Sequence, residues 1–349
     1  MADGRQKKER IGTGMKPGYI PKLPEIDYPI SRRENFRLFC EGRRHVYMPN
    51  AFTDVQMLMP KEDPDCHIPI FEDGYDGFGT HWTFVPQVGA AMVTPGTCAL
   101  SDIERWREDL KWPHLDQYDF TEDMDGIVSR LDPEKMTHTL LGHGLFERLH
   151  SCIGFEQALE AFLVSPDAVH DFFDALVQWK LDYLEKLFAA VPYKIDIVTY
   201  ADDMGTQKDT FFSPTIFEEF FYERVKKIFD YIHAKGMYIN YHSCGRNERF
   251  AGYYVSLGAD IWEAQRDAND FGLINERTNG RLGISTGLNA ALLSDPDAKD
   301  DELIGHVREF VDDSLPYKNV MALCYATNDR VAKLVIPELV QYSAEKYKK

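Results

Sequence analysis

The sequence lacks long apolar runs and an excess of basic residues. No stretch approaches the roughly 18 uninterrupted apolar residues that a transmembrane helix needs, and the charged first residues contain no apolar core of a secretory signal. Acidic side chains (57) outnumber basic ones (39), which leaves a formal net charge of −18 and argues against nucleic acid or an anionic membrane as the partner. We therefore expect a cytoplasmic protein that binds neither.

The sequence also lacks paired cysteines. Its six cysteines are scattered along 349 residues, a pattern that does not suggest a disulfide framework. No Cys-x₂₋₄-Cys pair of the kind that holds structural zinc in small modules is present. We expect reduced thiols, and a metal bound only by ligands from distant parts of the chain.

Strand-like and helix-like segments alternate regularly from residue 136 onward. This alternation predicts parallel βαβ units, and no glycine-rich dinucleotide motif follows any strand, which disfavours an open dinucleotide-binding sheet. The pattern therefore favours an α/β fold, a distorted (β/α)8 TIM barrel. The predicted strands lie at residues 46–52, 137–142, 195–201, 237–241, 259–263, 281–285 and 320–324.

The N-terminal residues differ from the rest of the chain. Residues 1–30 are polar, basic and then proline-rich, which predicts a flexible arm. Residues 31–349 are expected to form a single TIM-barrel domain, because a barrel of this length is normally one domain with insertions. Within it, residues 53–135 are irregular and aromatic, and we expect an elaborated loop region over one end of the barrel.

The most informative motif is His242-Ser-Cys244-Gly, which is followed by Glu263 and Cys324. One imidazole, one carboxylate and two thiolates suit a tetrahedral zinc ion. Each of these residues lies at or just after the end of a predicted strand, and the carboxyl ends of parallel strands are the face where barrel enzymes place their chemistry. The pattern predicts zinc bound inside an enzyme core, with Glu263 as the least certain ligand.

Several segments resemble the uroporphyrinogen decarboxylase superfamily, in particular its zinc- and corrinoid-dependent methyltransferase branch. The resemblance covers about residues 31–347. The decarboxylase branch fits poorly, because the segment 45–52 (HVYMPNAF) lacks the arginines with which that branch grips carboxylates. The matching segments are 31–36 (SRRENF), 202–207 (DDMGTQ), 212–220 (FSPTIFEEF) and 242–245 (HSCG).

The resemblance implies an O-demethylase component that moves a methyl group from a methoxylated aromatic compound to the cobalt of a partner corrinoid protein. His242, Cys244 and Cys324 would bind zinc, and a related cobalamin-independent methionine synthase suggests Glu263 as a further ligand. Zinc acts on such reactions as a Lewis acid on an ether oxygen or by holding a thiol as thiolate. The ligands alone leave the direction of transfer open.

Other side chains are candidates for catalysis or substrate binding. Asp202 and Asp203 end a predicted strand and could bind substrate or orient a ligand, with loop capping as an equal alternative. His143 could donate a proton to a departing phenolate, although a structural hydrogen bond is nearly as plausible. Four aromatic or imidazole side chains are expected to contact the substrate: His81, Trp82, Tyr200 and Tyr241.

Three other functions remain open. A methyl-corrinoid:thiol methyltransferase acting on coenzyme M or homocysteine would work in the opposite direction. A non-catalytic barrel could use zinc to scaffold a corrinoid protein, and it would then unfold without the metal. A uroporphyrinogen decarboxylase-like enzyme would need no metal. A homodimer is compatible with the sequence, which does not determine the oligomeric state.

Overall fold

The computed structural model describes residues 21–66, 72–86, 90–317 and 319–348. Its main sheet has seven strands in the order β1-β5-β6-β7-β8-β9-β10, and all neighbours pair in parallel. Asn50, which is separated from β1 by a short helix, forms a parallel bridge with Ala322 of β10, and this bridge brings the two edges of the curled sheet together. The prediction of a distorted α/β barrel is confirmed, with seven parallel strands in one curled sheet. The strands are β1 (Val55–Met57), β5 (Met136–Leu141), β6 (Ile197–Ala201), β7 (Tyr238–Ser243), β8 (Ile261–Ala264), β9 (Gly283–Gly287) and β10 (Val320–Leu323).

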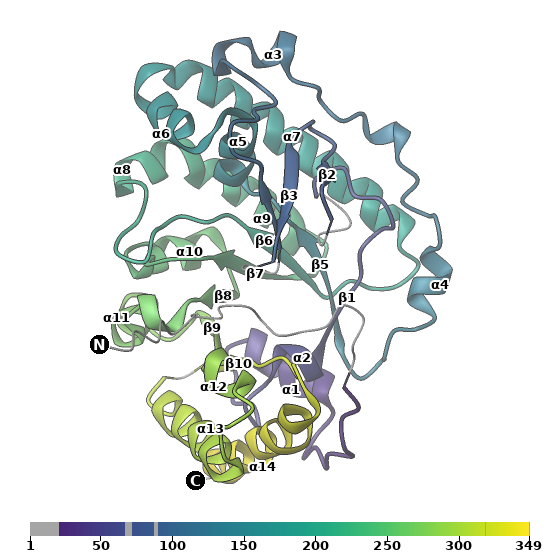
Figure 1. The fold of residues 1–349 in the computed structure, drawn as a ribbon, viewed down its shortest axis with the longest axis vertical. Coiled ribbons are helices and arrows are strands. Elements are labelled where there is room, and N and C mark those ends of the chain that lie inside the picture. Colours follow the sequence, from purple (N-terminus) through teal and green to yellow (C-terminus); the bar gives the residue numbers. More distant parts are fainter. Residues whose placement is uncertain (1–20, 67–71, 87–89, 318, 349) are drawn as a thin grey trace, which may run out of the picture.

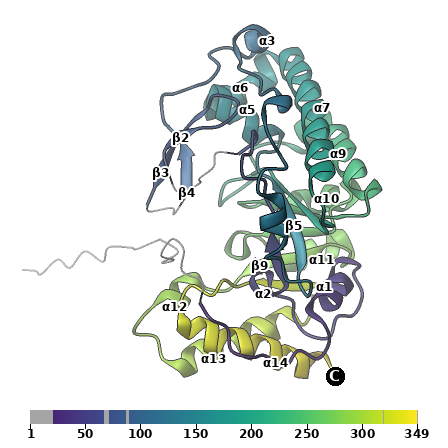
Figure 2. The same ribbon diagram turned by 90° about the vertical axis from the view of Figure 1, so that its right-hand side faces the viewer.

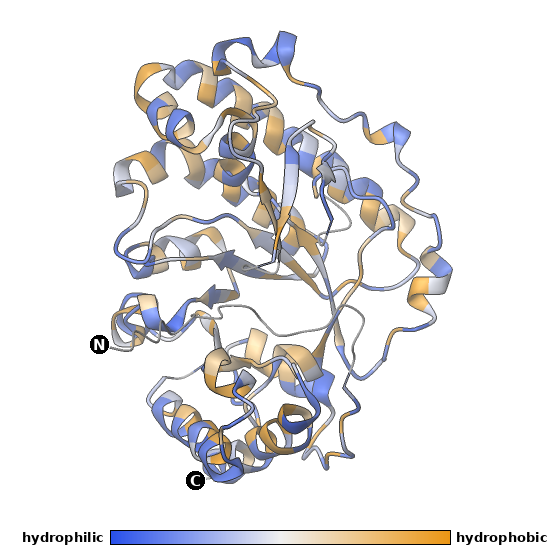
Figure 3. Ribbon diagram, viewed as in Figure 1, coloured by the Kyte–Doolittle hydropathy of each residue, from blue (hydrophilic) through white to orange (hydrophobic). Residues whose placement is uncertain are grey.

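Helices cover the outside of this sheet (Figure 1), and they show both apolar and hydrophilic stretches (Figure 3), as expected for helices with one face on a core. A π-helical turn at Phe217–Tyr222 joins α8 to α9, and another at Val331–Val335 precedes α14. The helices are α1 (Arg32–Cys40), α2 (Ala51–Asp54), α3 (Trp106–Asp109), α4 (Met124–Val128), α5 (Leu145–Ile153), α6 (Phe155–Val164), α7 (Pro166–Ala190), α8 (Pro214–Ile216), α9 (Glu223–Ala234), α10 (Ala251–Leu257), α11 (Phe271–Thr278), α12 (Ala290–Ser294), α13 (Asp300–Ser314) and α14 (Ile336–Tyr347).

The longest helix, α7, illustrates how the sequence forms these elements. Pro166 occupies its first turn, where the missing N–H costs nothing. Val169, Phe172, Phe173 and Leu176 recur at helical spacing, and all four are fully buried in the main core cluster. These features account for a continuous helix over Pro166–Ala190.

The first predicted strand differs from the observed structure. Within residues 46–52 only Asn50 makes a bridge, α2 follows at once, and the strand itself begins at Val55. The Asn50 side chain explains the change, because its Oδ1 accepts hydrogen bonds from Phe52 N at the start of α2 (3.4 Å) and from Cys324 N (3.1 Å). Asparagine is a strong helix N-cap, so its local preference ends the extended segment.

The irregular region contains a small antiparallel sheet of β2 (Gly74–Tyr75), β3 (His81–Val85) and β4 (Ala90–Val93). Figure 2 shows this sheet set apart from the main one. Residues 1–20, most of the predicted arm, lie outside the described residues. The remainder packs on the barrel: Ile26 and Tyr28 contact the cluster around Tyr47. Among the described residues, no helix has the length and apolar character that crossing a membrane requires.

Candidate metal centre and barrel cavity

Three side chains with metal-ligating atoms meet at the carboxyl ends of β6 and β7. These atoms of Asp203, His242 and Cys244 all lie within 4.8 Å of one another. His242 Nε2 is 3.5 Å from Cys244 Sγ and 3.7 Å from an Asp203 carboxylate oxygen. Ligand atoms around a tetrahedral zinc ion are about 3.3–3.8 Å apart, as follows from bond lengths of about 2.0–2.3 Å. The spacing of these donors therefore fits a zinc ion.

The backbone near Cys244 keeps these groups together. Asp203 Oδ1 accepts a hydrogen bond from Cys244 N at 2.6 Å. Gly245 has a φ of 85°, and a Cβ added to it would lie 2.1 Å from the carbonyl oxygen of Gly205. Only glycine permits this approach. The loop after β6 can thus lie directly against the loop after β7.

Glu263 contacts the other nitrogen of His242. Its Oε1 lies 3.2 Å from His242 Nδ1, so a proton on Nδ1 leaves the Nε2 lone pair directed toward Cys244 and Asp203. Burial opposes ionisation of Glu263, but His242 and the hydrogen bonds outweigh it and lower the carboxyl pKa. Burial likewise opposes protonation of His242, but the charge of Glu263 outweighs it and raises the imidazole pKa well above its usual range. This is the geometry of a carboxylate that orients a histidine ligand.

The structure does not bring Cys324 to this centre. Its side chain is 1% exposed and packs in the cluster that contains Leu288 and Val331. Burial raises the pKa of its thiol to about 12. Because side chains alternate along a strand and Leu323 lines the interior cavity, the next residue points away from it.

Asp202 caps a helix. Its carboxylate accepts hydrogen bonds from the backbone N–H groups of Leu145 (2.8 Å), Phe146 (3.3 Å) and Glu147 (2.9 Å) at the start of α5. Burial raises the pKa of Asp202 to about 7, even though these hydrogen bonds oppose the shift. The observed contacts match the capping alternative for Asp202, whereas the side chain of its neighbour Asp203 points to His242 and Cys244.

His143 lies beside a buried ionic cluster. Its Nδ1 is 2.6 Å from the carbonyl oxygen of Asp65 and 3.2 Å from the guanidinium of Arg148. Burial, and then Arg148, lower the pKa of His143 to about 4. Trp82 lies against its ring at 5.0 Å and donates to Asp76 at 3.1 Å. The imidazole is therefore neutral near pH 7 and held by structural contacts.

The remaining aromatic candidates lie away from the barrel interior. Tyr200 and Tyr241 are fully buried, stack at 5.6 Å and belong to the core between sheet and helices. Their neighbours Ala201, Asn240 and His242 face the opposite way and line the cavity. His81, in β3, pairs with Thr94 at 2.7 Å.

A cavity of about 570 Å³ occupies the barrel interior. Its wall is largely apolar, with Phe52, Ile261 and Met321 among its residues, and His242 and Glu263 border it. A second cavity, of about 880 Å³, borders the same two residues and Cys244, and extends toward α12 and α13. The side chains of His242 and Glu263 thus lie between two spaces large enough for small molecules.

The sequence analysis overlooked three polar residues in this interior, His138, Thr199 and Asn240. His138 and Asn240 line the cavity with Thr199 between them. A signal was available for Asn240, which lies two residues before His242 and so shares its face of the strand.

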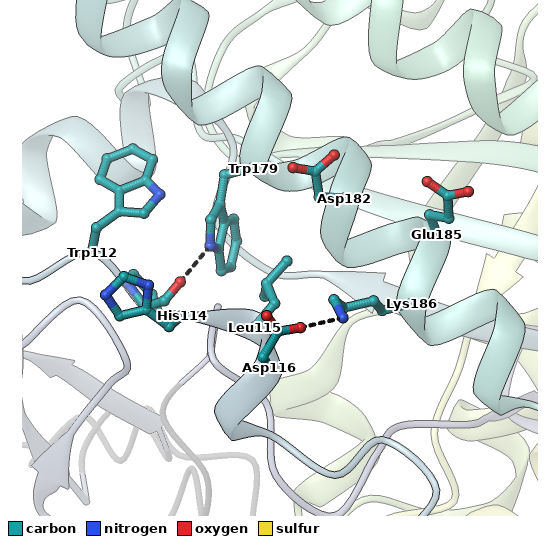
Figure 4. Close-up of a pocket in the computed structure, with 9 residues that line it drawn as sticks. Trp112, His114, Leu115, Asp116, Trp179, Asp182, Glu185 and Lys186 are labelled. Carbon is teal, nitrogen blue, oxygen red and sulfur yellow. Dashed lines mark hydrogen bonds and ion pairs between the residues drawn. The ribbon is translucent and has the colours of Figure 1, made fainter.

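Another depression, of about 490 Å³, lies against α7 (Figure 4). There Trp179 donates a hydrogen bond to the carbonyl oxygen of Pro113 (2.9 Å), and Lys186 pairs with Asp116 (2.7 Å). These contacts fasten the irregular region to the helix. None of the candidate metal ligands lines this depression.

An α/β barrel with metal-ligating side chains at the carboxyl ends of its strands has the general architecture of barrel metalloproteins. Residues 76–277, more than half of the chain, match the family model of uroporphyrinogen decarboxylase (URO-D). The chain belongs to the uroporphyrinogen decarboxylase family, which confirms the resemblance noted in its sequence.

Comparison with solved structures supports the fold. A methyltransferase from Methanosarcina mazei superposes with a TM-score of 0.64 over 92% of this chain and 100% of its own, at 12% sequence identity. At that identity the likeness concerns the fold. A structure assigned to a vitamin-B12 independent methionine synthase from Listeria monocytogenes matches at 15% identity over 66% of this chain and 69% of its own, and its TM-score of 0.43 is too low to support an inference. No curated protein matches the sequence.

Proposed function

We propose that the protein is a zinc-dependent methyltransferase that moves a methyl group from an aryl methyl ether to the cobalt of a partner corrinoid protein. The observation that carries this proposal is the position of His242. Its side chain belongs to the group of metal-ligating residues and also borders the apolar barrel cavity. A metal held there would meet a small apolar substrate from inside the barrel.

His242, Cys244 and Asp203 would hold the zinc ion, and Glu263 would orient His242. Three protein ligands leave one position open, as in catalytic rather than structural zinc sites. Bound zinc would supply Lewis-acid polarisation of the ether oxygen. The apolar wall would bind the aromatic ring and exclude water, so the methyl ether would be presented to the metal-ligating residues in a dry environment.

The partner would approach from the carboxyl ends of the strands. The second cavity borders His242 and Cys244 from that side and offers a space for a corrinoid carried by another protein. The structural similarity to a methyltransferase from Methanosarcina mazei is in keeping with methyl transfer. We propose that residues 31–349 act as one domain in the cytoplasm.

The test combines metal content with activity. Wild-type protein should hold about one zinc per chain and form methylcobalamin from cob(I)alamin and methoxybenzene. Cys244→Ala should lose zinc and activity yet remain folded by circular dichroism, whereas Cys324→Ala, the matched control, should keep zinc. Zinc that is lost from Cys324→Ala but kept by Cys244→Ala would contradict the proposed ligands. A wild-type protein that holds zinc but transfers no methyl group would contradict the proposed activity. A chain that unfolds when zinc is removed would favour the scaffold alternative.

A further inference from the structure

A row of hydrogen-bonded polar side chains crosses the wall of the barrel cavity, which is largely apolar but also includes Gln56, Lys135, Ser285 and Tyr325. His138, Thr199, Asn240 and Glu263 come from the adjacent strands β5, β6, β7 and β8. Thr199 Oγ1 lies 3.2 Å from His138 Nδ1 and 3.3 Å from Asn240 Nδ2. Asn240 Nδ2 also lies 3.5 Å from a carboxylate oxygen of Glu263. None of these contacts involves the three potential metal ligands Asp203, His242 and Cys244.

The hydrogen-bond directions along this row follow from its two ends. A carboxylate only accepts, so Asn240 directs its NH₂ group toward Glu263 and Thr199. Thr199 Oγ1 accepts the hydrogen bond from Asn240. The hydroxyl of Thr199 then donates its proton to His138 Nδ1, the acceptor available to it in the described part of the chain. Burial lowers the pKa of His138 to about 4, so the ring is neutral and carries its single proton on Nε2.

Two hydrogen-bonding atoms are left over. Asn240 Oδ1 is buried and has no partner among the residues that the structure describes. His138 is half-buried, and its Nε2–H also finds no acceptor within those residues. Both side chains line the cavity. Buried polar atoms are nearly always hydrogen-bonded. An uncharged acceptor and an uncharged donor on one cavity wall therefore point to a ligand that supplies the complementary groups.

We propose that His138 and Asn240 are substrate-binding residues that select a substrate carrying an uncharged hydroxyl group beside its apolar portion. A hydroxyl oxygen can accept from His138 and donate to Asn240. A carboxylate substituent placed between these two residues would instead face Asn240 Oδ1 and the nearby Glu263 carboxylate, both of which repel negative charge, whereas the lysine of the cavity wall, Lys135, lies directly before β5. The identification of this bound molecule as the methyl donor rests on the proposed function.

Calorimetric titration with three aromatic probes tests the selection. Methoxybenzene, 3-methoxyphenol and 3-methoxybenzoate share a ring and a methyl ether and differ in one substituent. Wild-type protein should bind 3-methoxyphenol roughly tenfold more tightly than methoxybenzene, in line with about 1.4 kcal/mol from hydrogen bonds to neutral groups. It should bind 3-methoxybenzoate least tightly.

Asn240→Leu and His138→Phe should each reduce that preference, measured as the ratio of the two affinities in the same variant, to about twofold. Ser285→Ala, a polar-to-apolar change elsewhere in the same cavity, is the matched control and should retain the tenfold preference. Zinc content and melting temperature equal to wild type would show that the variants are folded.

The two proposals can fail separately. Equal binding of methoxybenzene and 3-methoxyphenol by wild type, an unchanged preference in both variants, or no binding of any probe would overturn the role of His138 and Asn240. A hydroxyl preference that depends on these residues, in a protein without zinc or methyl transfer, would support the binding site and overturn the proposed function.

Discussion

Replacing Glu263 with glutamine tests whether this carboxylate orients His242 or binds the metal itself. Glutamine keeps the shape and the carbonyl oxygen but removes the charge that faces His242 Nδ1 at 3.2 Å. Loss of a carboxylate that orients a histidine ligand typically weakens metal affinity about 10- to 100-fold, which corresponds to about 1.4–2.7 kcal/mol. We expect Glu263→Gln to retain zinc with an affinity reduced by this factor.

Competition with a chromogenic chelator measures this change. Glu309→Gln is the matched control, because Glu309 lines the second cavity but is not among the potential ligands. It should bind zinc as wild type does. An affinity of Glu263→Gln within twofold of wild type would refute the orienting role. Complete loss of zinc would identify Glu263 as a direct ligand, as the sequence analysis had suggested.

Two further predictions concern stability. Gly245→Ala should lower the free energy of unfolding by about 2–4 kcal/mol, the combined cost of a left-handed backbone conformation and a clash with the backbone of Gly205. Gly252→Ala in α10 is the control and should not destabilise, because a Cβ there meets nothing within 4 Å. Equal urea midpoints for the two variants would contradict the clash. Wild-type protein should lose stability as pH falls from about 6.5 to about 4. In this range His143 is protonated in the unfolded chain but stays neutral in the folded protein, where its pKa is about 4. From pH 7 to pH 5 this difference lowers the free energy of unfolding by about 2 kcal/mol. Urea denaturation of His143→Gln over the same range should show a loss of stability that is smaller by that amount. The same pH dependence in variant and wild type would refute the role of His143.

Local sequence patterns predicted most of the barrel. Strand β7, with its β-branched and aromatic residues after Gly236, and helix α7, with Pro166 in its first turn, follow from periodicity and capping. The first strand was misplaced because Asn50 starts a short helix through its side chain. That interaction also involves Cys324, 274 residues away, and no local pattern could indicate it.

Within the candidate site, the sequence by itself determined that His242 and Cys244 share a strand end, because their spacing of two places both on one face. It could not decide which of the two neighbouring carboxylates lies beside His242. The tertiary structure directs Asp202 to the start of α5 and Asp203 to His242. The packing of Cys324 in a hydrophobic cluster was likewise decided by tertiary structure. A one-residue difference in strand phase turns a side chain from the interior to the helices, and only the register of neighbouring strands sets that phase.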